Sequence, residues 1–289
     1  MTSPAFLPRS FAVAAYARLP EAVQEAQALH AWLRARGLES FYGRLEDLDL
    51  RRRIENREVE ICIAVGGDGT MLRAAHLCAP VGIPILGINF GRLGFLIQVQ
   101  QREWPQALER LLQGDAWIEH RMMLQAEHRR SDQAQGHWYA LNEIVVCRGA
   151  LIRPIHVSAS ADGHLLTTYV ADGLIAATAT GSTAYALAAG GPILPPELRN
   201  ILLIPIAPHL SVDRAVVLSE GSAVTLTVRD GEAVLSVDGQ APISLAIGDE
   251  VLVRAGDYSA QFVRFGDAGY FYRNLTAYMN QNPSIGISR

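Results

Sequence analysis

The sequence predicts two domains of different class: an α/β domain built on a doubly wound parallel sheet, followed by an all-β domain. In the first third of the chain, apolar runs alternate with segments whose apolar residues repeat at helical spacing, as in parallel βαβ proteins. Beyond about residue 120, short alternating runs typical of strands dominate instead. With 289 residues, 49% of them hydrophobic, the chain can form one large core or two medium ones.

The first domain is expected at residues 1–120 as an alternation of strands and helices. Strands are expected at residues 10–16, 61–65 and 84–89, and helices at residues 20–36, 70–77 and 104–112. Pro20 stands at the start of the first helical pattern and Gly37 just beyond its end, which is the usual order of these two residues at helix ends. The arginine run at 51–53 is interpreted as solvated surface, with substrate contact as the minority alternative.

One strand-to-helix turn in this domain combines three glycines with a single carboxylate, in the order Gly66-Gly67-Asp68-Gly69-Thr70. We expect Thr70 to be the N-cap of the helix. Glycine amides at a helix N-terminus offer a place for phosphate oxygens. A carboxylate repels such an anion, but Asp68 is useful if it holds Mg²⁺ or accepts a proton from an attacking hydroxyl during phosphoryl transfer. The alternative is an ordinary β–α turn in which Asp68 only caps the helix.

The second domain is expected at residues 121–267. Its strands are expected at residues 140–147, 155–159, 222–229, 233–237, 251–255 and 261–265, and residues 274–280 are weakly helical. Asp230-Gly231 lies between two alternating runs and predicts a hairpin. The segment Thr180-Gly181-Ser182-Thr183 gathers hydroxyls and amides at the start of a short helix, which indicates either an anion or ribose site or a purely structural turn.

Composition excludes several classes of protein. The net charge of −4 and the pI near 6.1 indicate no general basic face, so a nucleic-acid partner is not expected. No apolar run is long enough to cross a bilayer, and the first residues lack an apolar signal core, so we expect a cytoplasmic protein without a membrane partner. Cys62, Cys78 and Cys147 show no ligand spacing and are interpreted as reduced core thiols.

The chain contains no lysine, since all 25 basic residues are arginine. This excludes a P-loop with its lysine, the ATP lysine of protein kinases and Schiff-base chemistry. If the protein handles phosphates, backbone amides, arginine and a metal ion must contact them.

Several motifs, taken in order, resemble those of NAD kinases. They are residues 66–70, 89–96, 141–143, 172–185, 205–211 and 238–240. The first motif is shared with diacylglycerol and sphingosine kinases, whereas the serial combination is far more specific. The resemblance covers about residues 10 to 270. It implies an α/β domain followed by a β-sandwich-like domain, a last segment, here residues 268–289, that returns to the first domain, and an active site between the two. It also implies a homodimer or homotetramer.

The resemblance also implies the reaction and its residues. Asp68 would accept the proton of the 2′-hydroxyl on the adenosine ribose of NAD, and Mg²⁺ would arrive with the phosphoryl donor rather than on protein ligands. Asn142 and Glu143 would fix the ribose, and Phe95 would lie beside the adenine. The other matched positions are Gly69 beside the phosphates, Arg153 near the new phosphate, Asp172, Thr183, Ala184, Tyr185 and Ala188 along the nicotinamide side, and Arg73, Ala207 and Gln240 as further substrate contacts.

The sequence departs from the family pattern at three positions and leaves alternatives open. Ala179 and Ala188 replace a common proline and a common serine, and Val170 is apolar where several members are polar or basic. ATP, another triphosphate and polyphosphate all remain candidate donors, and NAD and NADH both remain candidate acceptors. A lipid kinase would need an apolar or basic entrance, for which we find no patch. A catalytically silent nucleotide sensor is the alternative from another class.

Overall fold

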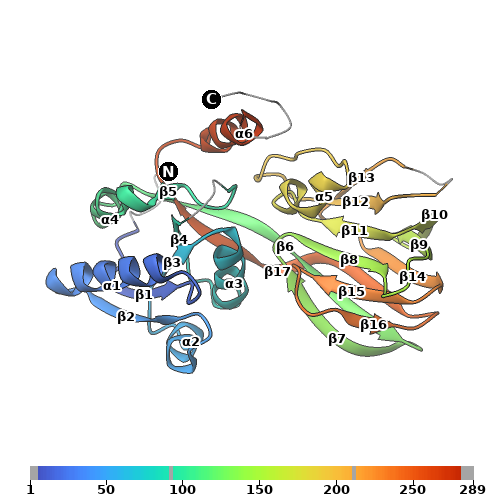
Figure 1. The fold of residues 1–289 in the computed structure, drawn as a ribbon, viewed down its shortest axis with the longest axis horizontal. Coiled ribbons are helices and arrows are strands. Elements are labelled where there is room, and N and C mark those ends of the chain that lie inside the picture. The colour runs from blue at the N-terminus through green and yellow to red at the C-terminus, as the bar shows by residue number, and fades with distance from the viewer. Residues whose placement is uncertain (1–5, 91–93, 210–212, 281–289) are drawn as a thin grey trace. The chain divides into compact units, whose positions relative to one another are not determined.

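The computed structural model describes residues 6–90, 94–209 and 213–280, so parts of two motifs, 91–93 and 210–211, lie outside the description. The chain divides into two compact units. Unit 1 comprises Met1–His120 and Ala260–Arg289, and unit 2 comprises Arg121–Ser259. The elements of both are labelled in Figure 1. The domain ends expected at residues 120 and 267 stay a prediction; in this division the chain re-enters unit 1 at Ala260.

Unit 1 contains a parallel sheet with helices on both faces. Its elements are β1 (Ser10–Ala15), α1 (Pro20–Ala35), β2 (Glu39–Arg44), α2 (Leu48–Glu55), β3 (Ile61–Gly66), α3 (Asp68–Cys78), β4 (Ile85–Asn89), β5 (Val99–Gln100), α4 (Trp104–Leu112) and α6 (Tyr270–Asn280). The strand order is β2-β1-β3-β4, and the last part of β17 (Glu250–Arg264) continues the sheet beside β4. The predicted doubly wound α/β architecture is confirmed.

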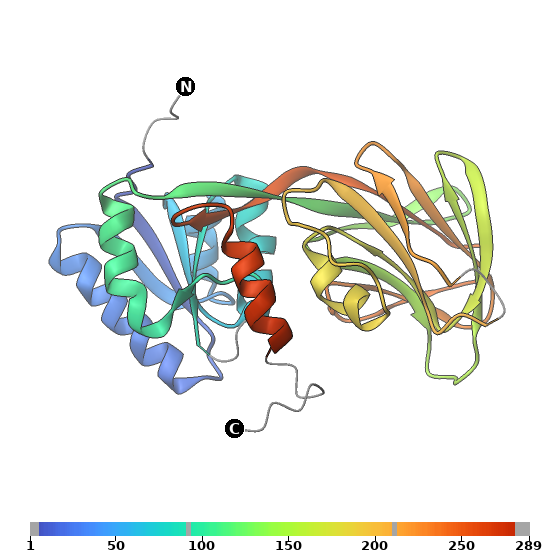
Figure 2. The same ribbon diagram turned by 90° about the horizontal axis from the view of Figure 1, so that it is seen from above.

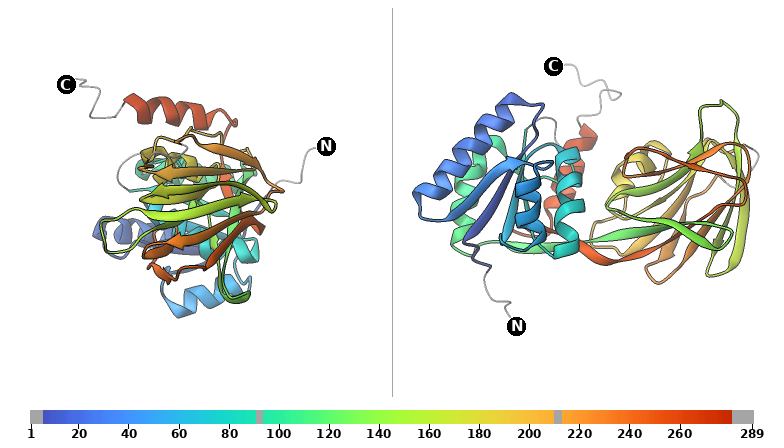
Figure 3. Two further views of the ribbon diagram at one scale, coloured as in Figure 1. Left: turned by 90° about the vertical axis from the view of Figure 1, so that its right-hand side faces the viewer. Right: turned by 90° about the horizontal axis from the view of Figure 1, so that it is seen from below.

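The two helical layers follow from the alternation of side chains along the strands. Residues such as Val13, Ile63 and Ile88 pack with Leu29 of α1 and Leu108 of α4 in one apolar core. Helices α1 and α4 lie over that face in Figure 2, and α2 and α3 lie over the opposite face in Figure 3. Strand β2 and helix α2 were not predicted. Both are half-exposed elements with few apolar residues, so their sequence patterns are weak.

Unit 2 is an antiparallel sandwich. Its elements are most of β6 (Trp117–Arg130), β7 (Gln133–Ala140), β8 (Glu143–Arg148), β9 (Ile155–Ala161), β10 (His164–Ala171), β11 (Gly173–Ala177), α5 (Tyr185–Ala188), β12 (Asn200–Ile206), β13 (Val216–Ser219), β14 (Val224–Asp230), β15 (Ala233–Val237), β16 (Ile243–Leu245) and most of β17. One sheet has the order β13-β12-β11-β8-β15-β16, and the other contains β10-β9-β14-β17 with β6 and β7. Both sheets contribute to one apolar core, and their strands can be followed in Figures 1 and 3.

The predicted hairpin at Asp230-Gly231 is wrong. Strand β14 pairs with β9 and β17, whereas β15 pairs with β8 and β16 in the other sheet. The turn therefore carries the chain from one sheet to the other. Because both strands point alternate side chains into the same core, an arch between sheets has the same alternating sequence as a hairpin within one sheet.

Two further expectations also need correction. The runs 251–255 and 261–265, expected as separate strands, are parts of the single strand β17. The run 140–147, expected as one strand, is divided, because β7 ends at Ala140 and β8 begins at Glu143. The two residues between them, Leu141 and Asn142, form a turn at which backbone amides become available to a side chain.

Candidate active site

Asp68 is the first residue of helix α3, directly after the turn that follows β3. The N-cap is Gly67, and the amides of Thr70 and Met71 both donate to its carbonyl oxygen, at 2.8 and 3.2 Å. The expectation that Thr70 is the N-cap is therefore wrong. The helix begins two residues earlier than its apolar pattern indicates, since glycine and aspartate contribute no apolar side chain to that pattern.

The Asp68 carboxylate is held by the loop that follows β4. The backbone amide of Phe95 donates to Asp68 Oδ2 at 3.0 Å, and that of Leu96 approaches Oδ1 at 3.4 Å. Gly94 permits this approach, because a Cβ at that position would stand 2.2 Å from Asp68 Oδ2. The carboxylate is half-buried, whereas the neighbouring Gly69 is exposed at the start of the helix.

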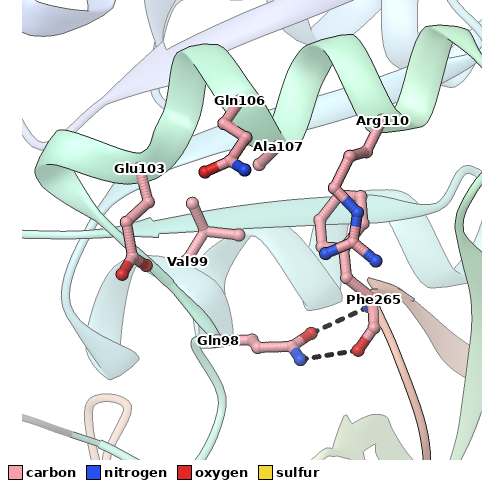
Figure 4. Close-up of a pocket in the computed structure, with 7 residues that line it drawn as sticks. All are labelled: Gln98, Val99, Glu103, Gln106, Ala107, Arg110 and Phe265. Carbon is pink, nitrogen blue, oxygen red and sulfur yellow. Dashed lines mark hydrogen bonds between the residues drawn. The ribbon is translucent and has the colours of Figure 1, made fainter.

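The loop at residues 94–98 is attached to the end of strand β17. Gln98 Nε2 donates to the carbonyl oxygen of Phe265 at 2.8 Å, and Gln98 Oε1 accepts from the amide of Phe265 at 3.0 Å. Figure 4 shows this pair beside a cavity of about 270 Å³ under α4. The Phe95 ring is buried and lies 6.3 Å from the Phe271 ring of α6. The loop around Asp68 therefore depends on residues far along the chain.

Arg73, the other matched residue of α3, is placed differently. It lies more than a turn beyond Asp68, where it pairs with Glu46 at 3.8 Å and covers the ring of Tyr16 at 5.0 Å. A spacing of this length does not place two side chains on the same helix face. The structure therefore shows Arg73 in a surface ion pair.

A second group of matched residues lies in unit 2, at the turn between β7 and β8. The Asp238 carboxylate accepts hydrogen bonds from the amides of Leu141, Asn142 and Glu143, at 2.7, 2.9 and 2.9 Å. On the other side, Thr178 donates through its hydroxyl to the Leu141 carbonyl and through its amide to the Asn142 carbonyl. The backbone of the Asn142-Glu143 pair is thereby fixed from both sides.

The Thr178–Thr183 segment packs directly on this turn. A Cβ on Gly181 would stand 2.0 Å from the carbonyl oxygen of Asn142, so only glycine permits the observed contact. Thr183 directs its hydroxyl to the Thr180 carbonyl, and Ala184 donates its amide to the Gly181 carbonyl. The expected helix start here is a 3₁₀ turn, Gly181–Thr183, followed by the short helix α5.

Glu143 is the most perturbed carboxyl at this turn. Its side chain is 8% exposed, and no described residue provides a hydrogen bond to its Oε2 atom. Burial, with the Asp238 carboxylate as the second cause, raises the pKa of Glu143 to about 7, against an opposing hydrogen bond from the Tyr185 backbone amide. A buried carboxylate oxygen in this state fits a ligand that donates a hydroxyl hydrogen.

The remaining matched residues of unit 2 fall into two sets. Tyr185, Ala188 and Gln240 are exposed, with Gln240 in the same turn as Asp238. Asp172 lies at the opposite end of β8 from Glu143, where Arg148 Nε is 3.1 Å from its Oδ1. Ala207 lies at that opposite end as well, because the amide of Asp172 donates to the carbonyl oxygen of the preceding residue, Ile206. Arg153 also lies there, because it lines a cavity with Glu232 of the β14–β15 connection. Strand β8 has six residues, about 17 Å at the usual rise.

Sequence reasoning missed several contributors to these sites. Asp238 was noticed as part of a motif, but its three hydrogen bonds to the 141–143 turn were not expected. Gly94 and Thr178 were noticed only as motif members. A φ of +48° at Asp238 and the glycine at position 94 are features of the kind that mark such close backbone contacts.

No group of three or more potential ligands for a metal ion occurs among the residues that the structure describes. In the same ranges, no helix is both long and apolar enough to cross a membrane.

Comparison with known proteins gives the same family along most of the chain. Residues 17–116 match the model of the ATP-NAD kinase N-terminal domain, and residues 141–265 match that of the ATP-NAD kinase C-terminal domain. The NAD kinase of Heliobacterium modesticaldum is 45% identical over 77% of this chain and 79% of its own length. The NAD kinase of Chloroflexus aggregans is 40% identical over 87% of this chain and 91% of its own.

Two solved structures are also similar. The yeast NADH kinase complexed with NADH has a TM-score of 0.85 at 23% identity, with 97% of this chain and 90% of that chain covered. The NAD kinase from Archaeoglobus fulgidus in complex with ATP has a TM-score of 0.73 at 26% identity, with 94% and 98% covered. With both domain models matched and relatives at 40–45% identity over most of their length, the chain belongs to the NAD kinase family, the enzymes that phosphorylate NAD to NADP.

Proposed function

We propose that Asp68 is the general base of this reaction and takes the proton of the adenosine 2′-hydroxyl of NAD as that oxygen attacks the terminal phosphoryl group of the donor. The observation that carries the proposal is the pair of hydrogen bonds from the 95–96 amides, which fix a half-buried carboxylate beside the exposed start of α3. A positioned carboxylate of this kind contributes through geometry and proton transfer, which phosphoryl transfer needs more than covalent help.

The donor we propose is ATP, with polyphosphate as an alternative to be tested beside it. Support comes from the amide of Gly69 at an exposed helix N-terminus, where phosphate oxygens bind favourably. Mg²⁺ would enter on the phosphates of the donor and retain water ligands, as this ion does in kinases, so a cluster of protein ligands is not required. It would supply charge neutralisation on the transferred group.

For the acceptor, we propose that Asn142 and Glu143 bind ribose hydroxyls. Glu143 Oε2 is a buried acceptor without a partner among the described residues, and a sugar hydroxyl would satisfy it. Thr183, Ala184, Tyr185, Ala188 and Gln240 would complete the contacts around this end of β8. Asp172, Arg153 and Ala207 lie at the opposite end of that strand, so we propose that they contact other parts of the dinucleotide, in a homodimer or homotetramer.

The substitution Asp68→Asn tests the role of the base. We expect the variant to fold and to bind NAD, and to lose about 10²- to 10⁴-fold in kcat, the usual contribution of a positioned general base. The assay contains NAD, Mg²⁺ and either ATP or polyphosphate, and an NADP-specific dehydrogenase reads the product. The matched control is Asp47→Asn, because Asp47 also stands at a helix start in unit 1, as the N-cap of α2, and its carboxylate accepts from the amide of Arg44 at 2.7 Å. Near-normal turnover of Asp68→Asn would refute the role.

A further inference from the structure

A buried chain of polar groups in unit 1 ends on the loop that holds Asp68. The Tyr270 hydroxyl donates to the Glu119 carboxylate, at 2.7 and 2.8 Å from its two oxygens. Arg264 Nε donates to Glu119 Oε2 at 2.8 Å, and Arg264 Nη1 donates to the carbonyl oxygen of Leu96 at 2.9 Å. Arg264 is 1% exposed and Glu119 8% exposed, so the chain runs through the interior of the unit.

The guanidinium of Arg264 forms a fork whose two nitrogens donate to two different acceptors, the Glu119 carboxylate and the Leu96 carbonyl oxygen. Its plane is enclosed by the rings of Phe262 and Tyr270, at 5.1 and 4.7 Å from the central carbon. Its Nη2 atom has no hydrogen-bond partner in the described part of the chain. A buried ion pair of this kind adds little net stability, because the desolvation of both charges offsets their attraction. What the fork does provide is a fixed direction and distance for the Leu96 carbonyl.

Leu96 connects this series of polar groups to Asp68, because its carbonyl oxygen accepts from Arg264 while its amide approaches Asp68 Oδ1. Gln98 adds the second attachment of the same loop through its two hydrogen bonds with Phe265, drawn in Figure 4. Two neighbouring residues at the end of β17 thus fix both ends of a short segment. A shift of Arg264 would move the loop amides relative to the carboxylate that they hold.

We propose that Arg264 is a positioning residue for phosphoryl transfer, acting on Asp68 through Leu96 and oriented in turn by Glu119 and Tyr270. The inference rests on the role proposed above for Asp68. It assigns a catalytic consequence to a group that does not touch the substrate, and it predicts that the consequence disappears when the base is absent.

The first test is Arg264→Lys, which retains a positive charge beside Glu119 but cannot donate to both acceptors in the fork geometry. We expect kcat to fall about 10- to 100-fold, the range that misplacement of a catalytic group by about 1 Å causes, while the Kd for NAD changes less than about threefold.

Tyr270→Phe is the milder variant, since it removes one hydroxyl donor and keeps the aromatic ring. We expect a smaller loss of kcat, with the melting temperature retained to within a few degrees. Arg53→Gln is the control, because Arg53 also pairs with two carboxylates in unit 1, Asp49 and Glu58.

The second test combines Arg264→Lys with Asp68→Asn. If Arg264 acts through Asp68, the double variant turns over as slowly as Asp68→Asn alone, because there is no base left to misplace. An additional loss of the size seen in the wild-type background would overturn the inference, and so would unchanged kcat in both Arg264→Lys and Tyr270→Phe. Failure of the proposed function is seen separately, as turnover retained by Asp68→Asn alone.

Discussion

Glu143 is a carboxyl group whose ionisation opposes folding. Its pKa is raised to about 7 by burial and by Asp238, whereas an unfolded chain has the ordinary value near 4.5. Between those values the native state binds more protons than the unfolded state, so this group's contribution to stability falls as the pH rises through that window. This loss of stability reaches its full size above pH 7, where it lowers the free energy of unfolding by at most about 3 kcal/mol.

The substitution Glu143→Gln should therefore remove a pH dependence. We expect the difference in melting temperature between wild type and variant to change by several degrees from pH 5 to pH 8 without ligand, with the variant relatively more stable at pH 8. Calorimetry at the two pH values measures it. The same variant should bind NAD more weakly, since it presents a neutral amide to the ribose. If the melting temperatures of the two proteins changed equally between pH 5 and pH 8, the raised pKa of Glu143 would be contradicted.

Gly94→Ala tests the close approach of the loop to the base. The new Cβ would stand 2.2 Å from Asp68 Oδ2, so either the carboxylate or the loop must move. We expect kcat to fall about 10- to 100-fold with only a small change in stability. Gly221→Ala is the control, because a Cβ there meets nothing within 4 Å. Wild-type kcat in the Gly94 variant would show that the loop adjusts freely.

The sequence indicates the reacting residues better than their supports. Asp68 and the Asn142-Glu143 pair could be predicted because each lies in a local motif with a recognisable chemistry. Arg264 could not, since its contact with Leu96 joins residues separated by 168 positions. The same is true of Asp238, which lies 95 to 97 positions from the amides it accepts. Such contacts leave no periodic signal in one sequence.

At the scale of elements, the longer helices and several apolar strands were predicted, but the buried strands β11 and β12 were missed, and the pairing predicted for β14 was wrong. Helix α4 was expected at residues 104–112 and is found at Trp104–Leu112, because its apolar side repeats cleanly. The arch at Asp230-Gly231 was mistaken for a hairpin, because side-chain alternation reports which face is buried and not which strand is the neighbour. Strand pairing is decided by contacts across the sandwich.

The turn before β17 in unit 2 depends on the buried carboxylate of Asp249. It accepts hydrogen bonds from Arg130 and from the amide of Ala246, and His128 Nε2 lies 2.8 Å away. The Arg130 guanidinium is the main reason that the pKa of Asp249 lies well below its usual range. A carboxyl group whose pKa is lowered in the native state stabilises that state at pH values above its ordinary pKa. This contribution to stability is lost as the pH falls below that value.

We expect Asp249→Asn to destabilise the protein by about 2 kcal/mol at pH 7, because it weakens the charge-assisted hydrogen bonds between this buried carboxylate and Arg130. The difference from wild type should shrink as the pH is lowered below 4, and kcat should be retained where the variant is folded. Urea denaturation at several pH values measures both. Asp115→Asn is the control, because its ion pair with Arg110 is exposed and worth at most about 1 kcal/mol. Equal losses in the two variants would contradict the assignment.

At the scale of the molecule, composition and pattern were enough for the two fold classes. The alternation of strands and helices before residue 120 and the strand-rich remainder give the α/β unit and the sandwich. What they could not give is the continuity of β17. This strand begins in unit 2 and ends in unit 1, so its sequence changes from sandwich packing to parallel-sheet packing without a break.

That passage of β17 between units has a consequence for how the protein is made. Residues 6–120 are synthesised long before the strand end that supplies Arg264 and Phe265. Unit 1 therefore cannot complete its parallel sheet until the whole sandwich sequence has also been made, which departs from the usual N-terminal-first order. A polypeptide cut before Arg264 would keep Asp68 and the Asn142-Glu143 pair but would lack both residues that hold the loop at residues 94–98.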